Sequence, residues 1–83
     1  MTAAAATDNG QARRDAELRD ITAEMLEGVV RNAAIGIQFL ETPDIDLHGA
    51  DYAVRRAAAY LRAAIDALAR LKVSKRTEPT HAS

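Results

Sequence analysis

The sequence has no cysteine and no tryptophan, and only two prolines and four glycines among its 83 residues. Without cysteine the chain can form neither a disulfide nor a thiolate zinc site, and two histidines are too few to replace thiolates. A single core of this size rarely supplies more than about 3–5 kcal/mol of stability. The composition therefore predicts a protein that gains stability by association, with itself or with another molecule.

Long apolar runs are also missing. The longest uncharged run of note covers residues 32–40, which is nine residues, whereas a membrane span needs about 20. The first ten residues contain no basic stretch followed by large apolar residues, so they do not resemble a signal peptide. We therefore expect a soluble, cytoplasmic protein with no membrane partner.

The strongest pattern that is present is a heptad repeat in the second half of the chain. Apolar residues recur there at alternating spacings of three and four, which is the a/d pattern of a helix that packs lengthwise along other helices. The larger members mostly alternate with alanine, so a neighbouring helix can approach closely. The repeat consists of Leu47, Ala50, Val54, Ala57, Leu61, Ala64, Leu68 and Leu71.

The first half of the chain predicts a second amphipathic helix. Its large apolar side chains, with the exception of Ile35, fall within about half of the helix circumference at 100° per residue. Asp8 is predicted to cap this helix, with Gln11 three residues later able to reach back. The residues of this helix that we predict to lie in a helix–helix interface are Leu18, Met25 and Val29.

Two residues inside this helix leave alternatives open. Gly36 lies near the middle of the apolar face, where it indicates either a close helix contact or a break in the helix. Asn32 lies at the edge of the same face, where it either fixes the register between helices or points to solvent. The sequence alone does not decide between these alternatives.

A short link separates the two helices. Pro43 cannot continue a helix and disfavours helical geometry in the residue before it, so the first helix must end there. Asp44 or Asp46 is predicted to cap the second helix. Ion pairs at i,i+4 spacing are predicted for Asp15–Arg19, Glu27–Arg31, Asp51–Arg55 and Asp66–Arg70. The predicted organisation is a disordered tail over 1–8, a helical hairpin over 9–73 with helices over about 10–41 and 49–73 and a link over 42–48, and a polar tail over 74–83.

The fold class is therefore all-α, an antiparallel two-helix hairpin. Each helix has an apolar face wider than one partner helix can cover, and the simplest arrangement that covers both is a homodimeric four-helix bundle. The charge distribution suits antiparallel helices: residues 1–46 hold nine acids and four bases, whereas residues 47–83 hold three acids and seven bases. In general form this is similar to Rop, the plasmid RNA-binding hairpin, in architecture alone and without a match at the level of residues.

The basic residues of the second helix are the candidate site for an anion. They suggest a phosphate-binding strip, or a solvated helix face whose charges pair locally with Asp51 and Asp66. The low aromatic content and a pI near 6.1 favour the solvated face. The candidate anion-binding residues are Arg55, Arg56, Arg62 and Arg70.

No pattern in the sequence indicates catalysis or a cofactor. There is no Gly-rich phosphate loop, no helical HExxH and no serine in an elbow turn. His48 lies near several aspartates, but their spacing matches no metal site, and we interpret it as a capping or exposed loop histidine. The preferred hypothesis is a small non-enzymatic protein–protein interaction module, such as an adaptor, regulator or inhibitor. The alternative is a Rop-like dimer that binds nucleic acid through the basic face of the second helix.

Overall fold

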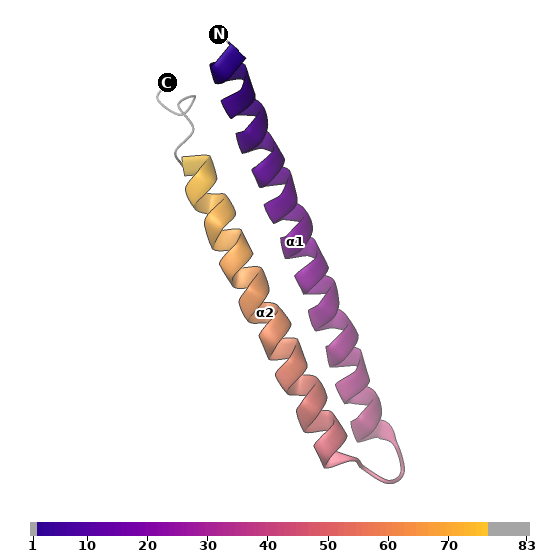
Figure 1. Cartoon of the computed structure of the whole chain (residues 1–83). Helices are drawn as coiled ribbons and strands as arrows, with labels where there is room; N and C mark the ends of the chain where they lie inside the picture. Colours follow the sequence, from indigo (N-terminus) through magenta and orange to yellow (C-terminus); the bar gives the residue numbers. More distant parts are fainter. Residues whose placement is uncertain (1, 77–83) are drawn as a thin grey trace.

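The chain forms a helical hairpin in a computed structural model that describes the backbone of residues 2–76 and the side chains of residues 10–76. Helix α1 spans Thr2–Glu41 and helix α2 spans Leu47–Arg76. The two helices run antiparallel along each other, with the link at one end of the hairpin (Figure 1). The predicted all-α hairpin is confirmed.

Both helices are longer than the sequence pattern predicts. α1 begins at Thr2 instead of near residue 10, because alanine, the strongest helix former, fills the chain before Asp8. Asp8 consequently lies within the helix and is not its cap. α2 continues three residues past the predicted end at Val73, and Lys75 and Arg76 occupy its last turn, where positive charge complements the helix dipole. Met1 of the predicted first tail and residues 77–83 of the predicted second tail lie outside the described residues.

The link is held by hydrogen bonds at both of its ends. Thr42 Oγ1 donates to the carbonyl oxygens of Phe39, at 3.2 Å, and Asp44, at 2.8 Å. Asp46 caps α2: its Oδ1 accepts the Gly49 amide at 2.8 Å, and its carbonyl oxygen accepts the Ala50 amide at 2.9 Å. The side-chain bond satisfies the Gly49 amide, which has no carbonyl partner within the helix, and the bond from Ala50 is the first i→i−4 bond of α2. Of the two predicted caps, Asp46 is therefore the one used.

The contact between the helices follows one heptad seam on each, which we call the inner seams. Their members are buried or half-buried and recur at alternating spacings of three and four. The α2 seam is mostly alanine, and the four apolar residues that are fully buried are all alanines of α2. The inner seam of α1 is Gln11, Asp15, Leu18, Thr22, Met25, Val29, Asn32, Gly36 and Phe39; that of α2 is Ala50, Ala53, Ala57, Tyr60, Ala64, Ala67, Leu71 and Ser74.

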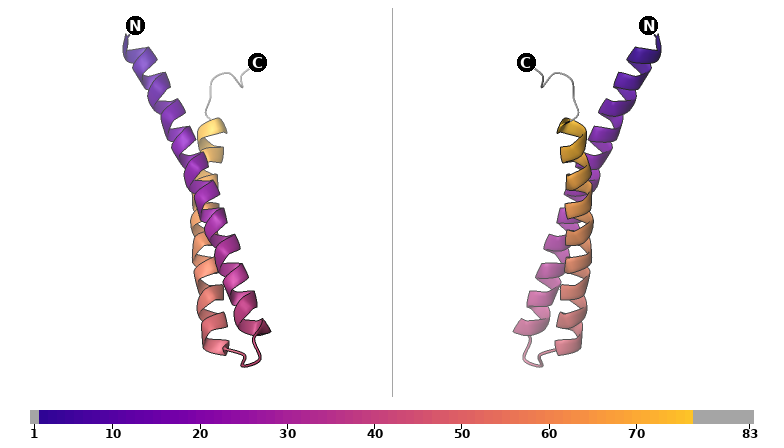
Figure 2. Two further views of the ribbon diagram at one scale, coloured as in Figure 1. Left: turned by 90° about the vertical axis from the view of Figure 1, so that its right-hand side faces the viewer. Right: turned by 90° about the vertical axis from the view of Figure 1, so that its left-hand side faces the viewer.

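The hairpin is a single layer of two helices with no interior of its own. Its extents are 66 × 23 × 14 Å, and the smallest is close to the diameter of one helix with its side chains, about 10–12 Å. Figure 2 shows the two helices crossing, with the N-terminal turns of α1 diverging from α2. The radius of gyration is 18.8 Å, compared with about 12 Å for a compact chain of this length. No helix in the described part of the chain is long and apolar enough to cross a membrane.

Candidate interaction surface

A second apolar stripe runs along each helix beside its inner seam. Its large members directly follow an inner-seam residue in α1, as Leu26 follows Met25, and likewise in α2, as Leu61 follows Tyr60. One residue corresponds to about 100° around a helix, so each helix presents two seams at nearly a right angle. The stripe of α1 contains Ala23, Leu26, Val30, Ala33, Ile37 and Leu40; that of α2 contains Leu47, Val54, Ala58, Leu61, Ile65 and Leu68, and all of these residues are exposed.

The two stripes lie on the same side of the hairpin. Each is displaced from its inner seam in the same rotational sense when viewed from the N-terminus of its own helix. If two such helices packed through their inner seams in parallel, their stripes would lie on opposite sides of the pair. Reversing the direction of one helix moves its stripe to the other side, so an antiparallel pair presents both stripes on one side. We call this combined surface the open face. Its residues repeat the three-and-four spacing of the inner seams.

The open face holds most of the exposed apolar surface. Fourteen large apolar residues are exposed among the described side chains. Nine belong to the open face, and four, Ile21, Ile35, Tyr52 and Val73, lie on the opposite side. Val30 is 69% exposed and Leu47 is 70% exposed, so these side chains are not covered by the hairpin itself. A contiguous apolar surface of this kind marks an interaction site.

The heptad repeat predicted from the sequence is divided between the two surfaces. Its members at Ala50, Ala57, Ala64 and Leu71 lie in the inner seam against α1, whereas those at Leu47, Val54, Leu61 and Leu68 lie on the open face. The repeat is therefore not one contact line with α1. The predicted interface residues Leu18, Met25 and Val29 of α1 all lie in its inner seam and are half-buried.

Several members of the open face lie outside the predicted interface. Leu26, Val30, Ile37, Leu40 and Ile65 were not among the predicted interface residues, although they form much of this surface. The signal that could have found them is the second 3-4 repeat, one residue after the first. A stripe that covers half of the helix circumference contains two such repeats. The width of the stripe does not by itself show that it is made of two.

Glycines of α1 allow the close approach of α2. Gly36 is buried, and a Cβ atom there would lie 3.5 Å from Ala53 Cβ. α1 is continuous through this position, so the close-contact alternative is correct and the break is not. At Gly28 the ring of Tyr60 occupies the space of the missing side chain, because a Cβ atom would lie 2.5 Å from Tyr60 Cδ1.

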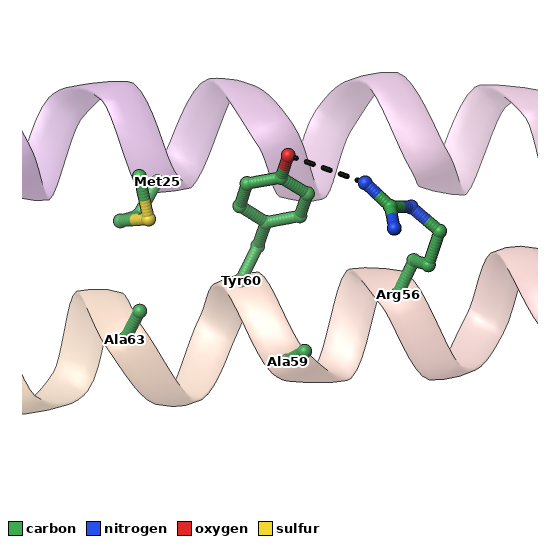
Figure 3. A pocket seen from close by; sticks show the side chains of 5 residues that line it. All are labelled: Met25, Arg56, Ala59, Tyr60 and Ala63. Atoms are coloured by element: carbon green, nitrogen blue, oxygen red, sulfur yellow. Dashed lines mark hydrogen bonds between the residues drawn. The ribbon is translucent and has the colours of Figure 1, made fainter.

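A shallow groove lies beside this contact, on the side away from the open face. It has a volume of about 270 Å³ and is lined by Met25, Arg56, Ala59, Tyr60 and Ala63 (Figure 3). Arg56 closes one end: its Nη2 donates to the Tyr60 hydroxyl at 3.5 Å, and its Cζ lies 5.7 Å from the Tyr60 ring centroid and 5.8 Å from that of Tyr52. Tyr52, followed by Tyr60, raises the pKa of Arg56. Arg56 is thus held by cation–π contacts within α2.

Polar side chains join the helices at the end opposite the link. Asp15 is buried, and its Oδ1 accepts hydrogen bonds from Ser74 Oγ at 2.6 Å and from Gln11 Nε2 at 3.3 Å. Gln11 Nε2 also donates to Ser74 Oγ, and Lys75 Nζ lies 4.0 Å from Asp15 Oδ2. The predicted pairing of Asp15 with Arg19 is wrong, because the carboxylate lies in the inner seam and turns to α2. The predicted pair of Glu27 with Arg31 is also not formed among the described side chains, where both residues are exposed.

Asn32 takes part in the inner seam instead of pointing to solvent. It is 7% exposed, and its Nδ2 donates to the Gly28 carbonyl oxygen at 2.8 Å. The bond is made within α1, so Asn32 satisfies its own amide without a partner on α2. The solvent-facing alternative is therefore wrong, and Asn32 is a polar residue within the apolar contact.

The four candidate arginines do not form one strip. Arg55 and Arg62 are seven residues apart and share the outer edge of α2, whereas Arg56 and Arg70 lie about 100° further round the helix. Two of them form the predicted local pairs, Arg55 with Asp51 at 2.8 Å and Arg70 with Asp66 at 3.2 Å. Asp51 raises the pKa of Arg55, first through the hydrogen bond and then through its charge.

His48 is exposed in the first turn of α2. The neighbouring Asp46 is occupied as the helix cap. Among the side chains of residues 10–76, no three from His, Asp or Glu are grouped so that they could hold a metal ion. The described side chains thus present an apolar surface, the open face, with charged residues beside it.

Comparisons with protein-family models, with curated proteins and with solved structures give no match for this chain. The proposals below rest on the geometry of the hairpin alone.

Proposed function

We propose that this chain is a small, non-enzymatic interaction module that binds protein helices through its open face. The observation that supports this is the placement of nine large exposed apolar side chains on one side of the hairpin. They form two stripes, one along α1 and one along α2, that lie next to each other on this side. In the cytoplasm, such a module serves as an adaptor, regulator or inhibitor.

The composition of the inner seams supports a need for a partner. They bury alanine, glycine and polar residues, and no large side chain is fully buried among the described residues. Hydrophobic stabilisation scales with the apolar area removed from water, and small cores require a further source of stability. Covering the open face would bury the leucines, valines and isoleucines that the hairpin leaves in solvent.

The spacing of the stripes favours a helical partner. Their residues recur at three and four, as in the inner seams, so a second helix can insert its side chains between them. Ala23 and Ala33 in α1, and Ala58 in α2, lie among the larger residues of the stripes. Small residues at these positions provide holes that interdigitated layers of a bundle require.

Nucleic-acid binding is the weaker candidate. A phosphate-binding strip needs several unpaired cations on one surface, but the four arginines lie on two sides of α2, and Arg55 and Arg70 each pair with an aspartate. We therefore treat binding of RNA or DNA as an outcome of the experiment and not as a second function.

Photo-crosslinking in cells tests this proposal. A photoreactive amino acid replaces Leu61 on the open face or, as the control, Val73 on the opposite side; the two native side chains are 44% and 59% exposed. We expect a crosslinked polypeptide of defined mass from position 61, absent from position 73 and lost when Leu26 is also changed to Asp. Equal labelling at both positions, or a nuclease-sensitive product in place of a polypeptide, would contradict the proposal.

A further inference from the structure

The open face carries large apolar side chains only along the part of the hairpin near the link. In α1 the apolar stretch runs from Ala23 to Leu40, and in α2 it runs from Leu47 to Leu68, interrupted by Asp51. Farther from the link, the equivalent positions hold no large apolar residue; they are Ala12, Ala16 and Arg19 in α1 and Lys72 and Lys75 in α2. The apolar surface of the open face therefore has limits along the length of the hairpin as well as around its circumference.

We propose that the occupant of the open face is the open face of a second copy, with the two links at the same end of the dimer. This inference rests on the proposed function and names the partner of that same surface. In this arrangement α1 of one copy lies against α2 of the other, antiparallel to it. The result is a four-helix bundle with its twofold axis along the helices.

The length and spacing of the open face fit a second hairpin. A stable protein interface buries about 800 Å² on each partner, and the nine large apolar side chains of the open face are each at least 44% exposed. Because the stripes of a second copy have the same spacing and the same limits, the two apolar stretches coincide in length.

Charges along the outer edges of the open face favour one arrangement. These edge positions lie two residues after every second inner-seam residue, counted from Gln11 in α1 and from Ala53 in α2, with His48 one heptad before Arg55, and all are exposed. On α1 they include three acids and one base, whereas on α2 they include three arginines, one histidine and no acid. The edge of α1 is Arg13, Asp20, Glu27, Ala34 and Glu41; the edge of α2 is His48, Arg55, Arg62, Ala69 and Arg76.

Two twofold arrangements place the open faces together. With the links at opposite ends, α1 lies beside α1 of the second copy and α2 beside α2, so acids meet acids and arginines meet arginines. With the links at the same end, each acidic edge meets a basic edge. Complementary charges contribute orientation more than affinity, so they decide between arrangements that bury the same apolar surface.

The register within the hairpin identifies the residues that would meet. Gly28 lies against Tyr60, and Gly36 against Ala53, so residues whose numbers sum to 88 or 89 lie at the same height. A twofold axis along the helices preserves these heights. Glu27 then lies level with Arg62 of the second copy, across the outer edge of the shared face.

The first measurement is the mass of the purified chain by light scattering at two concentrations a hundredfold apart. We expect a dimer, twice 8.9 kDa, at both concentrations. We also expect a shift to monomer for Leu61→Asp but not for Val73→Asp, which adds the same charge on the opposite side. A monomer of the parent chain at both concentrations would overturn the proposal.

The second measurement tests the arrangement and uses the absence of native cysteine. Glu27→Cys/Arg62→Cys is treated with a short bismaleimide, and the joined peptides are identified by mass spectrometry. We expect links between position 27 of one copy and position 62 of the other, and no covalent dimer from either single-cysteine variant. Links from 27 to 27 or from 62 to 62, or a dimer by mass that yields no link, would overturn the proposed arrangement.

The two proposals fail in different ways. A purified monomer that still crosslinks in cells from position 61 to a different polypeptide would overturn the second copy as occupant and leave the interaction module standing. A chain that crosslinks to no polypeptide from position 61 would overturn the interaction module itself.

Discussion

The ring of Tyr60 occupies the space where Gly28 lacks a side chain, so that a Cβ atom at Gly28 would lie 2.5 Å from Tyr60 Cδ1 and 2.6 Å from Tyr60 Cγ. These ring atoms are close to the root of the side chain and cannot swing away as a flexible chain end would. At Gly36, two turns later in the same helix, a Cβ atom would meet Ala53 Cβ at an ordinary 3.5 Å. The two glycines thus carry the same free-energy cost relative to alanine within a helix, but their surroundings differ.

Alanine substitutions at these glycines should have opposite effects on stability. Alanine favours a helix interior over glycine by about 1 kcal/mol, so Gly36→Ala should raise the free energy of unfolding by up to that amount. At Gly28 the gain is opposed by overpacking against Tyr60, which costs about 1–3 kcal/mol, so Gly28→Ala should lower it. Urea denaturation at one fixed protein concentration checks both.

Gly10→Ala is the control for this comparison, because a Cβ atom there would lie 3.7 Å from Arg14 Nη1 and nothing closer. It should be neutral or stabilising. If Gly28→Ala stabilised the protein as much as Gly36→Ala, the Tyr60 ring would not lie where the structure places it.

Asp15 and Ser74 should be coupled in stability. A hydrogen bond to a charged group contributes about 1.5–3 kcal/mol, but Gln11 and Lys75 remain near the carboxylate. We therefore expect Ser74→Ala to cost about 1–2 kcal/mol. A double-mutant cycle with Asp15→Asn, measured by thermal denaturation, should give a coupling above the 0.3–0.5 kcal/mol error usual for independent sites. Additive effects would show that the two side chains do not interact.

Much of the fold follows from the sequence because its determinants are local. Pro43 ends the first helix and Asp46 begins the second, and each acts through residues within four positions. The pairs Asp51–Arg55 and Asp66–Arg70 form for the same reason. The helix start at Thr2 differs from the prediction because the capping motif at Asp8 favours a start there, whereas the helix propensity of the alanines before it extends the helix.

The division of the apolar residues between two surfaces could not be predicted from the sequence in the same way. Leu61 and Ala64 belong to one heptad repeat, yet Ala64 is buried against α1 and Leu61 is 44% exposed. Hydrophobic spacing gives the width of a stripe but not the direction of its partner. Asp15 shows the same limit, because its partner Ser74 lies 59 residues away in the chain and no local rule relates them.

A charge at position 32 should make stability depend on pH. Asn32 is buried beside the Gly28 carbonyl oxygen, so Asn32→Asp places a carboxylate beside an acceptor without a cation. Burial raises the pKa of the new carboxyl group in the folded state above its unfolded value of about 3.9. Stability is then fully present below pH of about 4 and is lost as pH rises through the folded pKa, by about 3–5 kcal/mol at pH 7.

The check on this prediction is the difference between Asn32→Asp and the parent in free energy of unfolding, measured from pH 3 to pH 8. Gln38→Glu adds the same charge at an exposed position of α1 and should change stability by no more than about 0.5 kcal/mol. A flat difference for Asn32→Asp across this range would mean that position 32 is open to solvent.

The last prediction compares two side chains that the hairpin exposes equally. Leu61 is 44% exposed on the open face, and Ile35 is 41% exposed on the opposite side. If nothing covered either side, Leu61→Ala and Ile35→Ala would each remove a similar part-exposed contact and cost about the same. Because we propose that the open face is covered in solution, Leu61→Ala should cost about 2–5 kcal/mol, as for a buried leucine, and Ile35→Ala less than about 1 kcal/mol.

The measurement is chemical denaturation of both variants at one fixed concentration, together with their mass by light scattering. Leu61→Ala should also dissociate at micromolar concentration, whereas Ile35→Ala should remain associated. The concentration dependence is the informative part, since a contact between chains loses its effect on dilution while a contact within one chain does not. Equal costs that do not change on dilution would place Leu61 on a free surface, and the open face would then stabilise nothing.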